Sequence, residues 1–265
     1  MAREVPKALR KWLLLGGLGL AVAGCAHNWD EITGNDFKFR DLYKTPDAMT
    51  VLRDNPDGDA RAKAMQRLKE PKKHGGTDAQ QDEAVAILTR QAESALEPLC
   101  RLEAIRALGR FDDPRTTAPL VKAYYNAGNE KNFTPDISNQ IRTCALTALG
   151  QKNQPEAMAL LVQAAAPRSE SKPNPVQPVG FDSDRAKPDS DGPAAREIRL
   201  AAIRALGKTH NPQAIPVLLP HLSDKDVAVR DEAHSALQSL TGLKNVQPDV
   251  QSWQAAMGSQ VNLKG

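Results

Sequence analysis

Apolar residues recur along most of the chain at the spacing of an α-helix with one buried face. The pattern can be aligned on five arginines, and the apolar positions stand one before and three, four and seven after each. Alanine occupies the position three after the arginine in every copy, and leucine the position seven after it. These offsets form one stripe of a helix with 3.6 residues per turn. The aligned arginines are Arg61, Arg101, Arg142, Arg199 and Arg230.

Each helix of this pattern is followed by signals for a turn and a second helix. Three copies carry glycine eight residues after the arginine, where we expect a left-handed cap, and proline thirteen after it, suited to the first turn of a helix. Apolar pairs then stand nineteen and twenty after the arginine. The residues are Gly109, Gly150 and Gly207; Pro114, Pro155 and Pro212; and the pairs from Leu120, Leu161 and Leu218.

A helix pair of this size cannot bury both its faces alone, so neighbouring copies must share a core. The sequence therefore predicts an all-α protein, an α-solenoid of about five helix-turn-helix repeats. Composition agrees, because 40% of the 265 residues are apolar and only 4% are aromatic. We place repeats one to three at residues 57–166, and repeats four and five, with a C-terminal cap, at 196–258.

Irregular spacing of the arginines marks the loops. Residues 167–195 are rich in Pro, Ser and Asp, a composition typical of a disordered insert. A shorter insertion, "PKKHGGT" from Pro71, lengthens the turn of the first repeat. Residues 25–56 are interpreted as a tether and N-terminal cap, and residues 259–265 as a tail. The residues that could form the helical cap are Leu42, Met49, Val51 and Leu52.

The stretches "SDKDVAVRDEAHSALQSL", residues 223–240, and "IRLAAIRALG" resemble the HEAT repeat, in its short form called the phycobilin-lyase HEAT-like repeat. The resemblance implies that an aspartate before the first helix bonds to the arginine and ties repeat to repeat. Asp224 and Asp136 stand at this position. Other residues occupy it in the remaining copies. The closing "TGLKNVQPDVQSW" resembles the final unit of bacterial HEAT-repeat lipoproteins, which implies that Trp253 caps the last helix.

The beginning of the chain has the features of a targeting segment. Four cations in residues 1–11 precede an uncharged apolar run that is too short to span a bilayer and ends beside a cysteine. "VAGC", residues 22–25, resembles the bacterial lipobox, which implies a signal peptide at 1–24 and lipidation of Cys25. The alternative is an ordinary signal peptide. By resemblance to lipoprotein sorting, Ala26 favours the outer membrane, facing the periplasm of the bacterial cell envelope.

Charge argues against a nucleic-acid partner. The formal net charge is +3, and residues 1–24 account for all of it. Without them the chain is formally neutral, so it has neither the basic footprint of a nucleic-acid-binding protein nor that of a polybasic membrane-binding protein.

Residues with reactive side chains do not form a recognisable site. The five histidines lack metal-ligand spacing, and His234 is interpreted as a packed or partly exposed residue rather than a ligand. Cys100 falls on the buried stripe. Cys144 falls beside the stripe, so we expect it to be more exposed than Cys100. The sequence does not decide whether the two cysteines form a disulfide. Paired acids are interpreted as solvated turn carboxylates. The pairs are Asp112 with Asp113 and Asp182 with Asp184. No nucleotide or hydrolase motif is present, so we expect no enzyme activity, no cofactor, no metal and no small-molecule substrate.

These observations predict a lipid-anchored scaffold that binds a protein partner through its curved surface. The second helices are expected to line the concave side, with Lys122 and Tyr125 as candidate binding residues, since both fall just off the apolar positions. Two alternatives remain. One is an enzyme related to bilin lyases, after which the repeat is named, and the other is a structural envelope protein that packs against its own copies.

Overall fold

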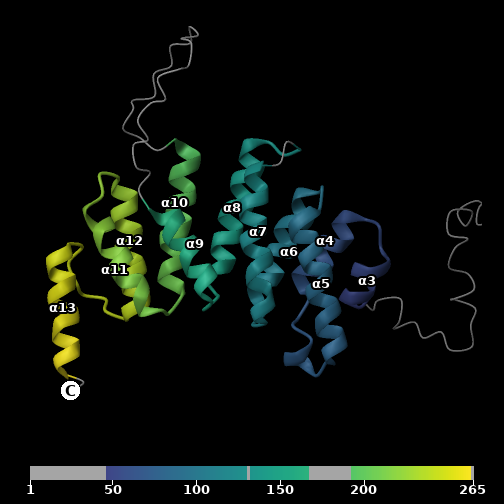
Figure 1. The fold of residues 1–265 in the computed structure, drawn as a ribbon, viewed down its shortest axis with the longest axis horizontal. Coiled ribbons are helices and arrows are strands. Elements are labelled where there is room, and N and C mark those ends of the chain that lie inside the picture. The colour runs from purple at the N-terminus through teal and green to yellow at the C-terminus, as the bar shows by residue number, and fades with distance from the viewer. Residues whose placement is uncertain (1–45, 130–131, 167–191, 264–265) are drawn as a thin grey trace, which may run out of the picture. The chain divides into compact units, whose positions relative to one another are not determined.

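The computed structural model describes residues 46–129, 132–166 and 192–263, and these residues form helices joined by turns, with no strand among them. Figure 1 shows the helices packed side by side in chain order. The prediction of an all-α solenoid of HEAT-like repeats is confirmed.

Two sets of helices alternate along the chain. The first helices of the repeats are α4 (Gly58–Arg67), α6 (Pro98–Arg110), α8 (Pro135–Leu149), α10 (Pro193–Lys208) and α12 (Val227–Thr241). Between them lie the second helices α5 (Asp78–Ser94), α7 (Thr117–Asn129) and α9 (Pro155–Ala165). The helix α3 (Ala48–Asp54) precedes α4, and α13 (Val250–Leu263) follows α12.

Each first helix packs against the first helix of the next repeat, from α4 through α6, α8 and α10 to α12. The first helices thus form one row. The second helices α5, α7 and α9 form another row beside it, and each also contacts the first helix that follows it in the chain. One continuous hydrophobic core therefore runs between the row of first helices and the row of second helices. The stripe predicted from the sequence lies in this core, because the five alanines three after the arginine are all fully buried: Ala64, Ala104, Ala145, Ala202 and Ala233.

The prediction that the repeated glycines end their helices in left-handed caps is wrong. Gly109 and Gly207 lie inside α6 and α10, and Gly150 has a right-handed φ of −61°. Their function is close packing instead. A Cβ on any of them would come within 2.6–2.8 Å of the next repeat, where the contacted residues are Ala148, Ala205 and Ala236. Each of these alanines stands six residues after the arginine of its own repeat.

The second helix of the fourth repeat is shorter than the others. Pro212 begins a 3₁₀ turn, as the proline signal suggests, and α11 then covers only Ile215–Leu218 before another 3₁₀ segment at Leu219–Ser223. Pro216 and Pro220 explain this difference, because a proline inside a helix removes a backbone hydrogen bond.

Both ends of the described stack carry the expected apolar contacts. Val51 and Leu52 of α3 are buried, whereas Leu42 lies outside the described residues. Trp253 of α13 is fully buried, and its ring meets that of His234 edge-on at 5.8 Å. The Nε2 atom of His234 lies 3.0 Å from the Val246 carbonyl oxygen, so this histidine is packed, as predicted. Of the expected insert, residues 167–191 lie outside the description, and α10 already begins at Pro193.

Candidate protein-interaction surface

Lys122 and Tyr125, the candidate binding residues, lie on α7 in the row of second helices. Both side chains are exposed, Tyr125 by 45%. The Lys122 ammonium lies 3.5 Å from a carboxylate oxygen of Glu93 on α5, and the Tyr125 hydroxyl donates to Gln163 on α9 at 3.1 Å. The two residues thus connect α7 to both neighbouring second helices. Such exposed contacts contribute little to stability, so substitution here should leave the fold intact.

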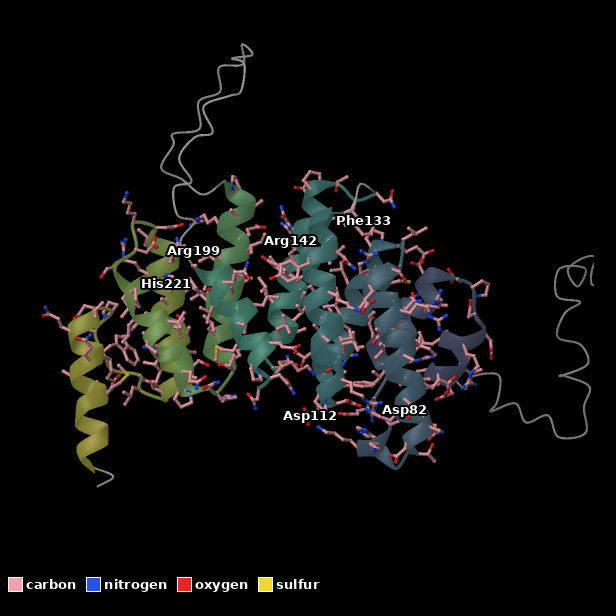
Figure 2. All side chains as sticks on the ribbon, viewed as in Figure 1. Asp82, Asp112, Phe133, Arg142, Arg199 and His221 are labelled. Atoms are coloured by element: carbon pink, nitrogen blue, oxygen red, sulfur yellow. The ribbon has the colours of Figure 1, made fainter. Side chains whose placement is uncertain are left out.

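Three of the arginines that define the repeat contact neighbouring elements, and their partners differ. The guanidinium of Arg101 lies 4.8 Å from the centre of the Phe133 ring, in the turn before α8. Arg142 lies 5.5 Å from the ring centre of Tyr124 on α7. Figure 2 shows Phe133 and Arg142 on adjoining parts of the stack. These cation–π contacts escaped the sequence analysis, because neither aromatic residue belongs to the repeated pattern.

In the fourth repeat the arginine binds a carboxylate. Arg199 is buried on α10 and donates to the side chain of Asp224, in the turn before α12. Arg230, six residues after Asp224, donates instead to its backbone carbonyl at 2.8 Å. The aspartate therefore ties one repeat to the previous one, as the resemblance implies. Asp136 differs, since it is exposed and, within the described structure, makes no ion pair with Arg142.

His221 completes the contact in the fourth repeat. Its Nδ1 atom lies 3.3 Å from an Nη2 donor of Arg199 (Figure 2). Burial, and then the positive charge of Arg199, lower the pKa of His221 below its usual value. The neutral ring is therefore favoured, and its Nδ1 accepts the hydrogen bond.

Basic side chains also cap the helices of the preceding repeat. Lys152, which follows α8, is buried and donates to the carbonyl oxygens of Leu108, at 2.8 Å, and Phe111. These carbonyls lie at the end of α6, where backbone oxygens lack partners within the helix. Burial lowers the pKa of Lys152 to about 8.

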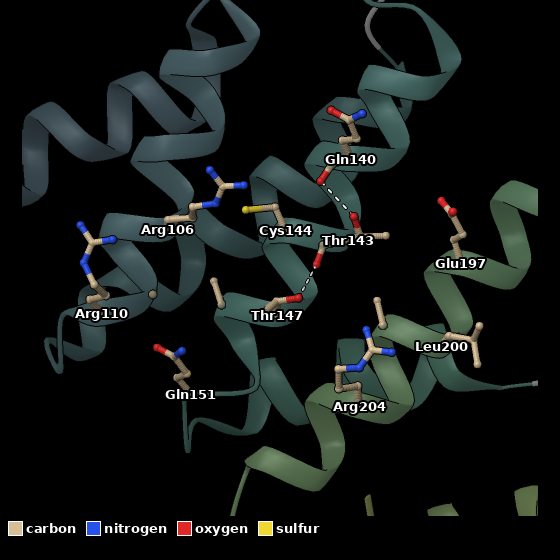
Figure 3. A pocket seen from close by; sticks show the side chains of 13 residues that line it. Arg106, Arg110, Gln140, Thr143, Cys144, Thr147, Gln151, Glu197, Leu200 and Arg204 are labelled. Carbon is tan, nitrogen blue, oxygen red and sulfur yellow. Dashed lines mark hydrogen bonds between the residues drawn. The ribbon is translucent and has the colours of Figure 1, made fainter. Parts of the chain in front are cut away.

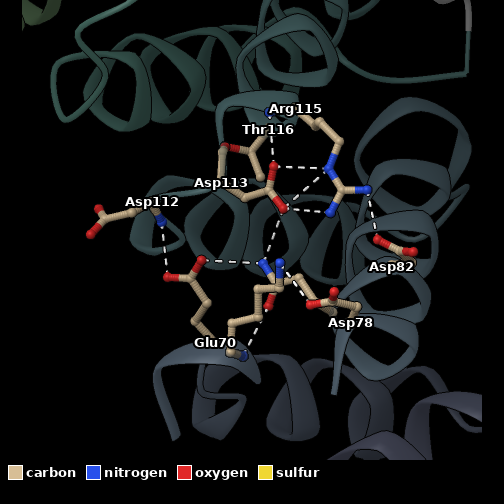
Figure 4. A network of polar contacts seen from close by, with 9 residues as sticks. Glu70, Asp78, Asp82, Asp112, Asp113, Arg115 and Thr116 are labelled. Atoms are coloured by element: carbon tan, nitrogen blue, oxygen red, sulfur yellow. Dashed lines mark hydrogen bonds and ion pairs between the residues drawn. The ribbon is translucent and has the colours of Figure 1, made fainter. Parts of the chain in front are cut away.

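A polar network joins the turns of the first two repeats (Figure 4). The Gln81 amide donates to Glu70 at 3.2 Å and to Asp113 at 3.1 Å, and Arg115 bridges Asp113 to Asp82. The Asp113 side chain is 8% exposed, so its interpretation as a solvated turn carboxylate is wrong. Hydrogen bonds from Arg115 hold the pKa of the Asp113 carboxyl below its usual range.

Asp112, the neighbour of Asp113, fits the prediction better. Its side chain is 73% exposed and pairs with Lys73, while its backbone amide donates to Glu70 at 2.9 Å. The network therefore fixes the position of the turns, and every carboxylate in it already has a protein partner. The Asp182 and Asp184 pair lies outside the described residues.

The two cysteines of the helical region are free thiols rather than a disulfide. Cys100 is buried and Cys144 is half-buried, so Cys144 is the more exposed of the two, as predicted. Glu103 stands at the position of α6 that corresponds to Cys144 on α8, and it is itself buried. Burial raises the pKa of both thiols to about 11, so neither is a thiolate at neutral pH. Across the described part of the chain, no group of three or more His, Cys, Asp or Glu side chains is arranged to hold a metal ion.

Cys25 and the whole predicted signal peptide lie outside the described residues. In the part that the structure describes, no helix has the length and apolar character needed to cross a membrane.

Comparison with known protein families matches two parts of the chain. Residues 192–252, from α10 to the start of α13, match the profile of HEAT repeats, and residues 101–126, from α6 to α7, match that of the PBS lyase HEAT-like repeat. The protein contains HEAT repeats. The first match begins at the N-cap of α10 and extends through α12 into α13, and the second begins in α6 and ends in α7. No curated protein matches the chain.

Proposed function

We propose that this HEAT-repeat protein is a scaffold without enzymatic activity that binds another protein at a membrane surface. The observation that carries the proposal is the pair of helix rows, because stacked repeats present extended surfaces that suit protein partners. Lys122 and Tyr125 are the proposed binding residues on the second-helix row. Tyrosine suits this role, since an exposed ring offers apolar area together with a polar end.

The membrane location rests on Cys25. The apolar run ends just before it, three small residues precede it, and polar residues follow it, which suits a lipid-anchored tether. Two or more acyl chains on this cysteine would hold the protein firmly, whereas a single chain gives marginal binding. We place the anchored protein in the cell envelope of a bacterium, at the outer membrane and facing the periplasm.

Affinity purification from cross-linked membranes tests the scaffold. The full-length protein should recover the same partner in repeated purifications, and changing Lys122 and Tyr125 together to alanine should weaken its recovery without changing the unfolding temperature. Lys225→Ala, at an exposed position in the turn before α12, is the control and should have no effect. Unchanged recovery by the double variant would move the binding surface elsewhere.

The anchor is tested separately. Cys25→Ser should abolish labelling by a fatty-acid analogue and leave an uncleaved precursor. Labelling and processing like those of the parent would refute the lipoprotein assignment and, with it, the proposed location.

The match to the PBS lyase HEAT-like repeat keeps a lyase-like enzyme as the second candidate. Incubation with a bilin distinguishes the two functions, because a lyase would produce a shifted absorption band and transfer the chromophore. Self-association that depends on protein concentration would favour the structural envelope protein instead.

A further inference from the structure

A groove of about 800 Å³ runs along the exposed side of α8, between α6 and α10 (Figure 3). Thr143 and Thr147 of α8 line its floor, Arg106 and Arg110 line the side formed by α6, and Arg204 lies on the side formed by α10. The groove is therefore built by the first helices, whereas Lys122 and Tyr125 belong to the row of second helices.

The groove exists because α8 carries short side chains where its neighbours carry long ones. Five residues after the repeated arginine, α6 has Arg106 and α10 has Arg204, but α8 has Thr147. Gly109 and Ala148 line the groove as well, and their close contact brings α6 and α8 together beneath it. The floor therefore offers hydroxyl and amide groups without charge, between two walls that carry guanidinium groups.

Two of the three arginines are already neutralised. Arg106 pairs with Glu103, and Arg204 donates from Nε to Glu232 at 3.1 Å. Each guanidinium is about half exposed and has further N–H donors, so it can still bond to a ligand.

Arg110 has no such neutralising partner. Its Nη2 donates to the carbonyl oxygens of Met65 at 2.7 Å and Gln66 at 3.2 Å, and no carboxylate among the described residues lies within ion-pair distance. Both carbonyl bonds use the same nitrogen, so the guanidinium keeps other N–H donors that a ligand can use. Arg110 thus adds a positive charge to the α6 wall beside Arg106.

We propose that the groove over α8 binds a short acidic segment of a partner protein, with a carboxylate paired to Arg110 and Arg106. The proposal rests on the scaffold function and assigns it a second surface. Gln140 and Ala148 are separated by about 12 Å along α8, which is the length of about four residues of extended chain. The hydroxyl and amide groups of the floor can then bond to the peptide backbone.

The charges around the groove favour an acidic peptide over a nucleic acid. Glu197 stands at the α10 side, and Glu103 and Glu232 flank the arginines, so phosphates following one another along the groove would meet carboxylates. A peptide can place its acidic residues at the α6 wall and a neutral or basic residue opposite Glu197.

Fluorescence anisotropy with a labelled peptide tests the proposal on the full-length protein. The probe is Gly-Ser-Asp-Glu-Ser-Lys-Ser-Gly, with two acidic residues for the α6 wall and a lysine for Glu197, and its counterpart carries Asn and Gln in place of Asp and Glu. We expect the acidic peptide to bind and the amide peptide to bind at least tenfold more weakly. Added NaCl should weaken the binding, because the attraction between exposed charges is screened.

Two variants locate the binding site. Arg110→Gln should lower the affinity for the acidic peptide at least tenfold. Thr147→Glu should do the same by placing a carboxylate against the arginines. It replaces none of the arginines, so it remains informative if Arg110→Gln fails to fold. Arg90→Gln, at an exposed position on α5, is the matched control and should bind like the parent.

Several outcomes would overturn the proposal: equal binding of both peptides, equal weakening by Arg90→Gln, or tighter binding of a DNA oligonucleotide that Thr147→Glu also blocks. If the Thr147→Glu variant recovers a partner from membranes as well as the parent does, the role of the groove is refuted and the scaffold function stands. Specific peptide binding by a protein that recovers no partner would confirm the groove and refute the scaffold.

Discussion

The repeated arginine has different partners at two junctions of the stack. Between α6 and α8, Arg101 contacts the ring of Phe133 in the turn before α8. Between α10 and α12, Arg199 contacts the carboxylate of Asp224 in the turn before α12, with His221 beside it. In both cases a buried cation on one repeat meets the turn that opens the next.

The position of the arginine is repeated from one repeat to the next, whereas the chemical type of its partner changes. The arginine stands at one helical position in every repeat. At these two junctions the turn of the following repeat brings a ring to Arg101 and a carboxylate to Arg199. A cation–π contact contributes about 0.5–2 kcal/mol, whereas removing one member of a buried ion pair costs about 3–5 kcal/mol. Removing the Asp224 carboxylate should therefore cost more stability than removing the Phe133 ring.

The largest effect is expected at Asp224. Asp224→Ala removes the Asp224 carboxylate from the buried Arg199 and should lower the free energy of unfolding by about 3 kcal/mol. Asp136→Ala is the matched control at the same position of an earlier repeat, where the aspartate is exposed, and should change stability by less than about 1 kcal/mol. Chemical denaturation measures both. Equal losses would show that Asp136 also holds its repeat in place.

A smaller loss is expected at the glycine contacts. Gly207→Ala brings a methyl group within 2.6 Å of the Cα atom of Ala236 and should cost about 2 kcal/mol, despite the higher helix propensity of alanine. Gly258→Ala in α13 meets nothing within 4 Å and should stabilise the protein by up to about 1 kcal/mol. Thermal unfolding of the two variants decides this, and a stabilised Gly207→Ala would mean that the helices can separate without cost.

The free energy of unfolding should depend on pH on both sides of neutrality, through His221 at the α10–α12 junction and through Lys152, which follows α8 and binds the end of α6. The folded state lowers the pKa of His221, so the unfolded state binds this proton more readily, and stability should fall as the pH drops below about 6.5. It also lowers the pKa of Lys152 to about 8, so stability should rise between about pH 8 and about pH 10.5. Each slope is at most about 1.4 kcal/mol per pH unit.

Urea titrations from pH 5 to 10.5 measure both effects. His221→Gln should flatten the acidic limb alone and Lys152→Met the alkaline limb alone. If either variant flattens both limbs, the pH dependence does not arise from these two groups.

The burial pattern could be read from the sequence because it depends on local geometry. The period of 3.6 residues fixes which side of a helix is apolar, and the positions of Ala104 and Leu108 on α6 followed from it directly. His234 was placed in the same way, from its position on the apolar stripe, whereas the role of Trp253 as a cap was implied only by the resemblance to the closing unit of HEAT-repeat lipoproteins.

Contacts between repeats could not be read in this way. Periodicity shows that a face is buried but not which atoms it meets, so Gly207 was expected to end a helix instead of approaching Ala236. Asp113 was expected to be solvated because the residues that cover it, Gln81 and Arg115, belong to different elements. The groove over α8 was missed for a related reason, since it arises from a difference between neighbouring helices.

The glycine contacts have a consequence for how such a chain can change during evolution. Gly109 meets Ala148, Gly150 meets Ala205 and Gly207 meets Ala236, although the chain between the two members of each pair has a different length. Recognition between repeats thus depends on matching helix faces and not on the connection between them. Residues can therefore be added or lost between repeats, or a new domain inserted there, without altering how the repeats recognise one another.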